Sequence, residues 1–175
     1  MKVVKDNIWK YYENGYWIIV PTNGYVTIDG RCPMGKGLAL QTKKRFPTLE
    51  ESLGSMIRKY GNKVFIWYNR IITFPVKHHF ILDADINLIE ESCKDLIWQL
   101  ENQEKFHEED YNPITKIALP KVGCGAGNLA WEEVEPILDK YFDDRFIVAD
   151  LKWKELKYGK RNNRRFFFNH FNRYL

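Results

Sequence analysis

Residues 121–128, which read Lys-Val-Gly-Cys-Gly-Ala-Gly-Asn, have the composition of a loop that binds an anion through its backbone. Three glycines in five positions let the chain turn tightly and bring bare N–H groups close to a phosphate. The loop follows an apolar run at 117–120 and precedes an amphipathic segment at 131–141. This order of strand, glycine loop and helix is how α/β proteins hold phosphate groups. No Lys-Ser/Thr pair follows the glycines, so the loop is not a P-loop, and the third glycine falls too early for a dinucleotide fingerprint.

A second glycine loop strengthens the case for a ligand. Residues 32–39 read Cys-Pro-Met-Gly-Lys-Gly-Leu-Ala and open a predicted helix, after an apolar strand at 17–20. Either loop alone could be a plain connection between two elements. Two such loops at the ends of two strands predict a cleft that holds a pyrophosphate from both sides.

Apolar periodicity predicts helices and strands that alternate along the chain. Strands are expected at 17–20, stopped by Pro21, and at 63–67, 70–74, 114–119 and 146–151. Helices are expected at 38–46, 49–60, 86–100 and 131–141. Thr48 and Glu51 are expected to form a capping box for the second helix, and Asp85 to cap the third. Pro136 is expected to delay or kink the start of the fourth. Residues 101–113 read as a charged loop. The alternation predicts an α/β fold with a mainly buried sheet.

The composition predicts one cytosolic domain. The chain has 175 residues, of which 45% are hydrophobic, enough for one compact core. Its three cysteines, Cys32, Cys93 and Cys124, are odd in number and far apart, so a reducing compartment fits best. The longest apolar runs are far shorter than a membrane span of about 18 residues, and the first residues are too polar for a signal peptide.

The positive charge is concentrated at the end of the sequence. From residue 151 onward, eight basic residues face one glutamate, which gives +7 and leaves −3 for the other 150 residues of a chain with a net charge of +4. Seven aromatic residues interleave with these cations, a composition used to bind single-stranded nucleic acid. The alternative is a terminal helix or strand that packs its rings against the body and leaves its lysines in water.

Five motifs, taken in order, resemble those of a macro domain. The motifs lie at 19–23, 34–41, 74–79, 119–125 and 129–131. They are most similar to the branch that contains the terminal ADP-ribose protein glycohydrolase and the antitoxins that remove ADP-ribose from DNA. The resemblance covers residues 3–151, so residues 1–151 are expected to form the macro domain and 152–175 a basic aromatic extension. It implies a three-layer sandwich with a central mixed sheet flanked by helices.

The resemblance also implies an ADP-ribose site and assigns its contacts. Residues expected to bind ADP-ribose are Asp6, Asn7, Asn23, Met34, Gly35, Lys36, Gly37, Leu38, Gly123, Cys124, Gly125, Ala126, Gly127 and Asn128. The family's adenine-binding aspartate falls on Asn7, with Asp6 one place earlier, and either side chain can accept from the adenine amino group. No cofactor is expected besides this ligand.

Lys77 matches the catalytic lysine of this branch. In the protein glycohydrolase that lysine attacks the distal ribose, assisted by an aspartate of the second glycine loop, whose place here is taken by Gly127. The DNA-directed antitoxins also lack the aspartate. Lys77 can instead stabilise charge that develops on the ribose or on the leaving base. His79 matches a family histidine and is a candidate for orienting the site.

Other chemistry-bearing residues favour simpler interpretations. Adjacent residues of an extended segment point to opposite faces, so His78 and His79 are poor ligands for one metal ion, and no metal site is expected. Cys124 has no evident base, which favours a thiol that packs inward. Asp83 and Asp85 look like the start of a helix and not like an acid/base pair.

The sequence and its resemblance therefore predict a hydrolase of ADP-ribosyl adducts, with thymidine-linked adducts on nucleic acid as the first candidate and adducts on protein side chains as the second. The alternatives are a binder of ADP-ribose or a related signalling nucleotide, without chemistry, and a phosphatase of ADP-ribose-1″-phosphate. The expected partners are ADP-ribosylated nucleic acid or protein, and single-stranded nucleic acid through the extension; no membrane partner is expected.

Overall fold

Six strands form one mixed sheet in the computed structural model, which describes residues 1–105 and 113–150. The strands are β1 (Lys2–Val4), β2 (Trp17–Asn23), β3 (Phe65–Trp67), β4 (Ile71–Lys77), β5 (Ile117–Leu119) and β6 (Phe146–Ala149), arranged in the order β1-β6-β5-β2-β4-β3. Neighbours are parallel, except for β3, which runs antiparallel to β4. The carboxyl ends of β1, β6, β5, β2 and β4 therefore lie along one edge of the sheet, where α/β proteins place their ligands.

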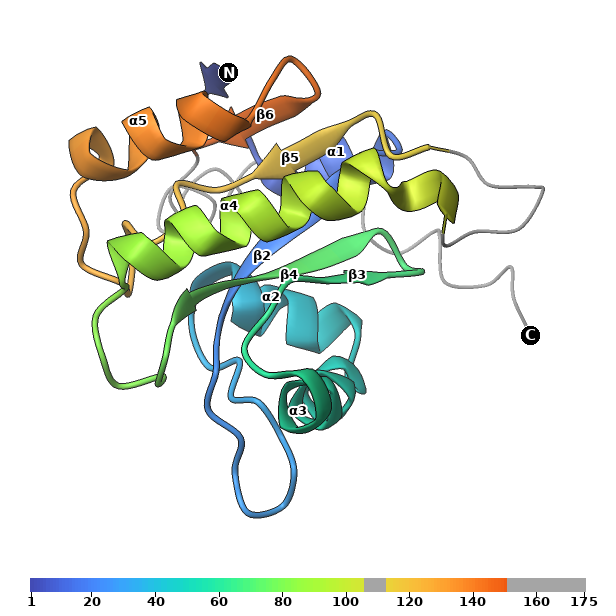
Figure 1. The fold of residues 1–175 in the computed structure, drawn as a ribbon, viewed down its shortest axis with the longest axis vertical. Helices are drawn as coiled ribbons and strands as arrows, with labels where there is room; N and C mark the ends of the chain where they lie inside the picture. Colours follow the sequence, from blue (N-terminus) through green and yellow to red (C-terminus); the bar gives the residue numbers. More distant parts are fainter. Residues whose placement is uncertain (106–112, 151–175) are drawn as a thin grey trace, which may run out of the picture.

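Helices cover both faces of this sheet (Figure 1). They are α1 (Ile8–Glu13), α2 (Gly37–Arg45), α3 (Leu49–Tyr60), α4 (Ile86–Glu101) and α5 (Trp131–Tyr141), with a short 3₁₀ turn at Gln103–Lys105. One core lies between the sheet and the pair α4 and α5, and a second lies between the sheet and α1, α2 and α3. The predicted three-layer α/β sandwich is confirmed.

Alternation along β2 shows how one strand serves both cores. Ile18 and Val20 point into the core of α1 and α3, whereas Ile19 points into the core of α4 and α5. All three side chains are fully buried. Strands buried on both faces have no polar side, which is why this stretch reads as a continuous apolar run.

Pro21 does not end β2, contrary to the prediction, because the strand continues to Asn23. The N–H of Trp17 bonds to Lys116 on the β5 side, and that of Ile18 bonds to Arg70 on the β4 side. Backbone groups alternate sides along a strand, so the nitrogen of Pro21 faces β5. Pairing with β5 covers only Trp17 and Ile18. The missing N–H of Pro21 therefore costs no ladder bond.

The first strand and helix of the chain were not predicted. β1 is three residues long and pairs in parallel with β6, at the register of Val4 with Ala149. α1 has six residues, and Asn7 caps it by accepting the N–H of Trp9 at 3.1 Å. Both elements are too short for a periodic apolar pattern to show.

Two details of the predicted helix starts are wrong. Thr48 makes no capping hydrogen bond through its side chain, so the expected box with Glu51 is absent. α5 begins at Trp131 and runs through Pro136 without a delayed start. The cap of Asp85, which accepts the N–H of Asn87 at 2.9 Å, is confirmed, as is the end of α3 at Gly61.

The basic aromatic extension, 152–175, and the middle of the charged loop, 106–112, lie outside the described residues. The predicted boundary at residue 151 therefore stays a prediction. Within the described part of the chain, no helix is both long and apolar enough to cross a membrane.

A buried glycine joins α3 to the loop that leads to the first glycine motif. A Cβ at Gly54 would lie 2.0 Å from the carbonyl oxygen of Gly30. Alanine favours a helix over glycine by about 1 kcal/mol. We nevertheless expect Gly54→Ala to lower the free energy of unfolding by about 1–3 kcal/mol, because backbone must move to admit the methyl group. Thermal denaturation measures the loss; Ser55→Ala, at the exposed next position, is the control, and equal midpoints would contradict this packing.

Candidate functional site

A groove crosses the carboxyl edge of the sheet, where β2 and β5 separate. β2 pairs with β5 only at Trp17 and Ile18 but follows β4 as far as Asn23 and Lys77. The larger hollow, here called the Lys77 cleft, encloses about 790 Å³, and the smaller, here called the Asn7 pocket, about 470 Å³. The two hollows share five lining residues and are continuous through them: Gly37, Leu38, Pro120, Lys121 and Gly125.

The two glycine loops face each other across this groove and offer unpaired backbone donors. Lys36 precedes α2 without a capping hydrogen bond from its side chain. The first-turn N–H groups of α2, from Gly37 to Ala39, have no acceptor among the described residues, nor do those of 125–127 in the second loop. Both sets of residues line the Lys77 cleft. Such donors, one set at a helix N-terminus, bind anions.

The second loop is folded tightly around two of its glycines. Gly123 has φ +74°, and a Cβ at Gly127 would lie 2.3 Å from the carbonyl oxygen of Gly123. Asn128 follows with φ 61°, a conformation that asparagine tolerates better than most residues. A Cβ at Gly125, by contrast, would meet nothing within 4 Å, because this residue borders the open groove.

Buried polar side chains hold the first glycine loop. Asn23, 6% exposed, donates its amide to the carbonyl of Pro33 at 2.9 Å and accepts the N–H of Tyr25. Glu50, 7% exposed, accepts the N–H of Met34 at 2.8 Å and pairs with Lys43 at 2.7 Å. Asn23 thus lines the Lys77 cleft and also holds the loop of Pro33, which lines the same cleft; its predicted contact with ADP-ribose stays a prediction.

Lys77 links the loops that follow β4 and β5. Its side chain is 9% exposed and lines the Lys77 cleft. The ammonium donates to the carbonyls of Leu82 and Ala126, each at 2.5 Å. Two of the three N–H groups of the ammonium therefore bond to backbone, which leaves one for a ligand in the cleft that Lys77 lines.

His79 shapes the loop after β4 but does not line either hollow. Its Nδ1 accepts the N–H of Ile81 at 3.2 Å, and its ring lies 4.5 Å from that of Phe80 and 4.3 Å from that of Tyr25. Its carbonyl accepts the N–H of Leu82, so His79 stabilises the turn whose Leu82 carbonyl accepts the ammonium of Lys77. The predicted orienting role stays a prediction.

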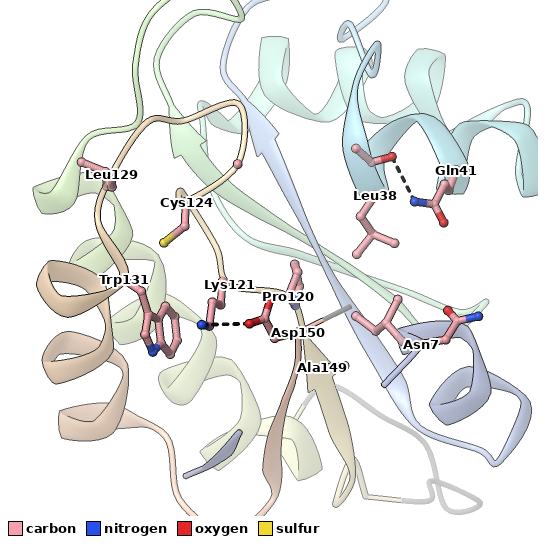
Figure 2. A pocket seen from close by; sticks show the side chains of 13 residues that line it. Asn7, Leu38, Gln41, Pro120, Lys121, Cys124, Leu129, Trp131, Ala149 and Asp150 are labelled. Atoms are coloured by element: carbon pink, nitrogen blue, oxygen red, sulfur yellow. Dashed lines mark hydrogen bonds and ion pairs between the residues drawn. The ribbon is translucent and has the colours of Figure 1, made fainter. Parts of the chain in front are cut away.

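Figure 2 shows the Asn7 pocket, whose floor carries an ion pair. Lys121 bonds to Asp150 at 2.9 Å and lies over the ring of Trp131, 5.1 Å from its centroid. Asn7 lines this pocket, whereas Asp6 pairs with Lys10 at 2.9 Å and does not line it. Lys10 and the N–H of Asn7 lower the pKa of Asp6. Of the two candidates, the structure places Asn7 at the pocket.

Of the predicted contacts in the two glycine loops, Met34 lies outside the groove and Cys124 lines only its smaller hollow. Met34 is 1% exposed, and its side chain belongs to the core of α1 and α3, so it does not line the groove. Cys124 lines the Asn7 pocket, and burial raises the pKa of its thiol to about 11. A neutral thiol is a poor nucleophile, which agrees with the inward-packing interpretation.

The other predicted contacts of the two loops line the groove: Gly35, Lys36, Gly37, Leu38, Gly123, Gly125, Ala126, Gly127 and Asn128.

Three acidic residues of the site were missed. Glu50 supports the first loop, Asp150 pairs with Lys121, and Asp83 lines the Lys77 cleft. Asp83 lies two residues before the helix cap Asp85, so the sequence pattern indicates a helix start at this position. Within the described residues, no group of three or more His, Cys, Asp or Glu side chains could hold a metal ion.

Known proteins share this architecture. The DNA ADP-ribosyl glycohydrolase of Thermus aquaticus is 30% identical over 113 residues, which span 58% of this chain and 29% of that protein. The macrodomain of Mycobacterium tuberculosis DarG has a TM-score of 0.61 at 26% identity, over 77% of this chain and 88% of that one. Thermosipho africanus DarTG in complex with ADP-ribose has a TM-score of 0.58 at 23% identity, over 78% of this chain and 38% of that one. No family model matches the chain.

The fold is similar to that of solved macrodomains, which confirms the resemblance seen in the motifs. Within that class, the chain is similar to the macrodomains of DNA ADP-ribosyl glycohydrolases. The chain spans about 29% of the length of the Thermus relative.

Glu50 offers a test of how the first loop is held. Glu50→Ala leaves the buried N–H of Met34 without its acceptor, and we expect it to lower the free energy of unfolding by about 1–3 kcal/mol. Glu51→Ala removes the exposed neighbouring carboxylate, which forms no cap, and should change the stability by less than about 0.5 kcal/mol. Urea denaturation of both variants measures the difference; equal losses would contradict the role of Glu50.

The raised pKa of Cys124 predicts slow alkylation in the native protein. With a pKa of about 11 against the ordinary thiol value of 9.0, the reactive thiolate at pH 8 is about a hundredfold scarcer than in an unfolded chain. The rate should rise about tenfold per pH unit up to about pH 11, because only the thiolate reacts. Mass spectrometry of the Cys124 peptide after iodoacetamide treatment, with and without urea, measures it. Equal rates in the two conditions at pH 8 would contradict the burial of this thiol.

Proposed function

We propose that this chain binds ADP-ribose along the groove and hydrolyses ADP-ribosyl adducts, with thymidine-linked ADP-ribose on nucleic acid as the first candidate substrate. The observation that carries the proposal is the placement of Lys77. Its ammonium lies at one end of a groove whose middle offers two sets of unpaired N–H groups and whose other end is the Asn7 pocket.

This arrangement matches the parts of ADP-ribose in order. The Asn7 pocket, walled by Trp131 and Leu38, suits the adenine, because an aromatic and an aliphatic side chain can hold a flat ring. The loops around Gly37 and Gly125 suit the pyrophosphate. The distal ribose would then reach Lys77, where a cation can stabilise charge on the ribose or on the leaving group.

The relatives support a hydrolytic reaction on nucleic acid. The Thermus aquaticus protein is named a DNA ADP-ribosyl glycohydrolase, and the Thermosipho africanus structure contains ADP-ribose. Protein side chains are the second candidate substrate, because the motifs also resemble those of the terminal ADP-ribose protein glycohydrolase. We propose that the extension at 152–175 binds single-stranded nucleic acid. We also propose the cytosol as the compartment.

One observation favours a second candidate function, a binder without chemistry. Gly127 stands where the resemblance implies an assisting aspartate, and its surroundings exclude a side chain, because a Cβ would lie 2.3 Å from the carbonyl oxygen of Gly123. A binder would return ADP-ribosylated oligonucleotide unaltered after long incubation.

The test is release of ADP-ribose from an oligonucleotide that carries thymidine-linked ADP-ribose, with wild type and Lys77→Met side by side. Methionine keeps most of the aliphatic stem and removes the ammonium. We expect Lys77→Met to lower the turnover rate at least about a hundredfold, as loss of a group that stabilises developing charge does. The affinity for free ADP-ribose, measured by calorimetry, should change less than about fivefold.

Lys44→Ala, an exposed lysine near the end of α2, is the matched control and should keep wild-type turnover. Equal turnover in wild type and Lys77→Met would remove Lys77 from the mechanism. A wild type that binds ADP-ribose but releases none, from either nucleic-acid or protein adducts, would establish the binder.

A further inference from the structure

Asp83 is the one acidic residue among the described residues that line the Lys77 cleft. It lies on the loop between β4 and α4, directly after Leu82, whose carbonyl accepts the ammonium of Lys77. The cleft therefore presents a cation and a carboxylate from neighbouring positions at the end where the substrate's bond to the distal ribose would lie.

The carboxylate of Asp83 is held from one side. Its Oδ1 accepts the side-chain amide of Asn128 at 2.5 Å, which ties the loop after β4 to the second glycine loop. The next residue strengthens the tie, because the N–H of Ala84 bonds to the carbonyl of Gly127 at 2.8 Å. No described residue bonds to Oδ2. One oxygen is thus fixed, and the other is open to solvent or to a ligand in the cleft.

The packing around Gly127 explains why the carboxylate comes from the loop after β4. A Cβ at position 127 would lie 2.7 Å from the Cβ of Ala84 as well as 2.3 Å from the backbone of Gly123. The second loop can therefore not supply an acidic side chain at this point without moving its backbone. Ala84 fills this space, and Asp83, which directly precedes it, lines the cleft.

We propose that Asp83 is the general base that activates water for the hydrolysis, an inference that rests on the proposed function. Oδ2 takes a proton from a water molecule, and the water oxygen forms a bond to C1″ of the distal ribose. The bond from C1″ to the nucleobase nitrogen breaks, and its electron pair stays on that nitrogen, which takes a proton from the ammonium of Lys77. The proton on Asp83 then returns to the amine of Lys77, so one water is consumed and both side chains recover their charge.

Asp83→Asn tests this role, because it keeps the shape and an oxygen that can accept the amide of Asn128. With the ADP-ribosylated oligonucleotide as substrate, we expect kcat to fall about 10²–10⁴-fold while the Kd for free ADP-ribose stays within about threefold. In Asp83→Ala, added formate should restore part of kcat, since a small carboxylate can enter the space of the lost one. A purely structural role predicts no rescue. Asp144→Asn, an exposed carboxylate at the amino end of β6, is the control and should keep wild-type kcat.

The outcomes separate this inference from the proposed function. Active wild type with an equally active Asp83→Asn would overturn the role of Asp83 alone. A fall in kcat accompanied by an equal loss of ADP-ribose affinity and no rescue by formate would make Asp83 structural, which also overturns it. An inactive wild type that still binds ADP-ribose would overturn the hydrolase, and the general base with it.

Discussion

The separation of β2 from β5 after Ile18 is the constraint on which the rest of the site depends. Two parallel strands that stay paired leave no space between the loops at their carboxyl ends. Here β2 continues beside β4 for five more residues, from Ile19 to Asn23, while β5 ends at Leu119 and its loop turns away. Most side chains of the strands beside this opening belong to the two apolar cores. Polar groups of a ligand at this edge can therefore bond only to loop backbone and to a few side chains at the strand ends.

Lys77 lines this opening and bonds to the loops that follow β4 and β5. A buried ammonium without partners is costly, and here two carbonyls from different loops satisfy two of its directions. The same bonds set the spacing of the loops after β4 and β5. A change at Lys77 therefore acts on cleft geometry as well as on charge, which is why binding and turnover have to be measured together. The amide of Asn128 and the carboxylate of Asp83 make a second tie between these loops, close to the first.

The sequence predicted most of the alternating strands and helices and the two glycine loops well, because these features have local signatures, whereas the three layers came from the resemblance. Apolar runs marked β2, β4 and β5, and the glycines marked the turns. The resemblance then singled out Lys77 and Asn23, which the structure brings to one cleft. Pro21 misled the prediction, since whether a strand tolerates proline depends on which neighbour its nitrogen faces, and here that neighbour is β5, far along the chain at Ile117–Leu119.

The missed acidic residues share one cause. Glu50 and Glu51 are adjacent carboxylates at a helix start, and only the folded chain shows that Glu50 points to the backbone of Met34. Asp83 and Asp150 likewise acquire their partners, Asn128 and Lys121, from distant segments. Patterns of neighbouring residues predict helix caps and turns. Contacts between loops that are distant in the sequence depend on the topology of the fold, so such patterns do not predict them.

The two glycine loops rest on different cores. Cys32 and Met34 anchor the first loop in the layer of α1 and α3, whereas Val122 and Leu129 anchor the second in the layer of α4 and α5. A molecule that bonds to both loops therefore connects the two halves of the sandwich across the sheet. Ligand binding would then slow hydrogen exchange in helices that never touch the ligand, on both faces together, because opening either half would first have to release it.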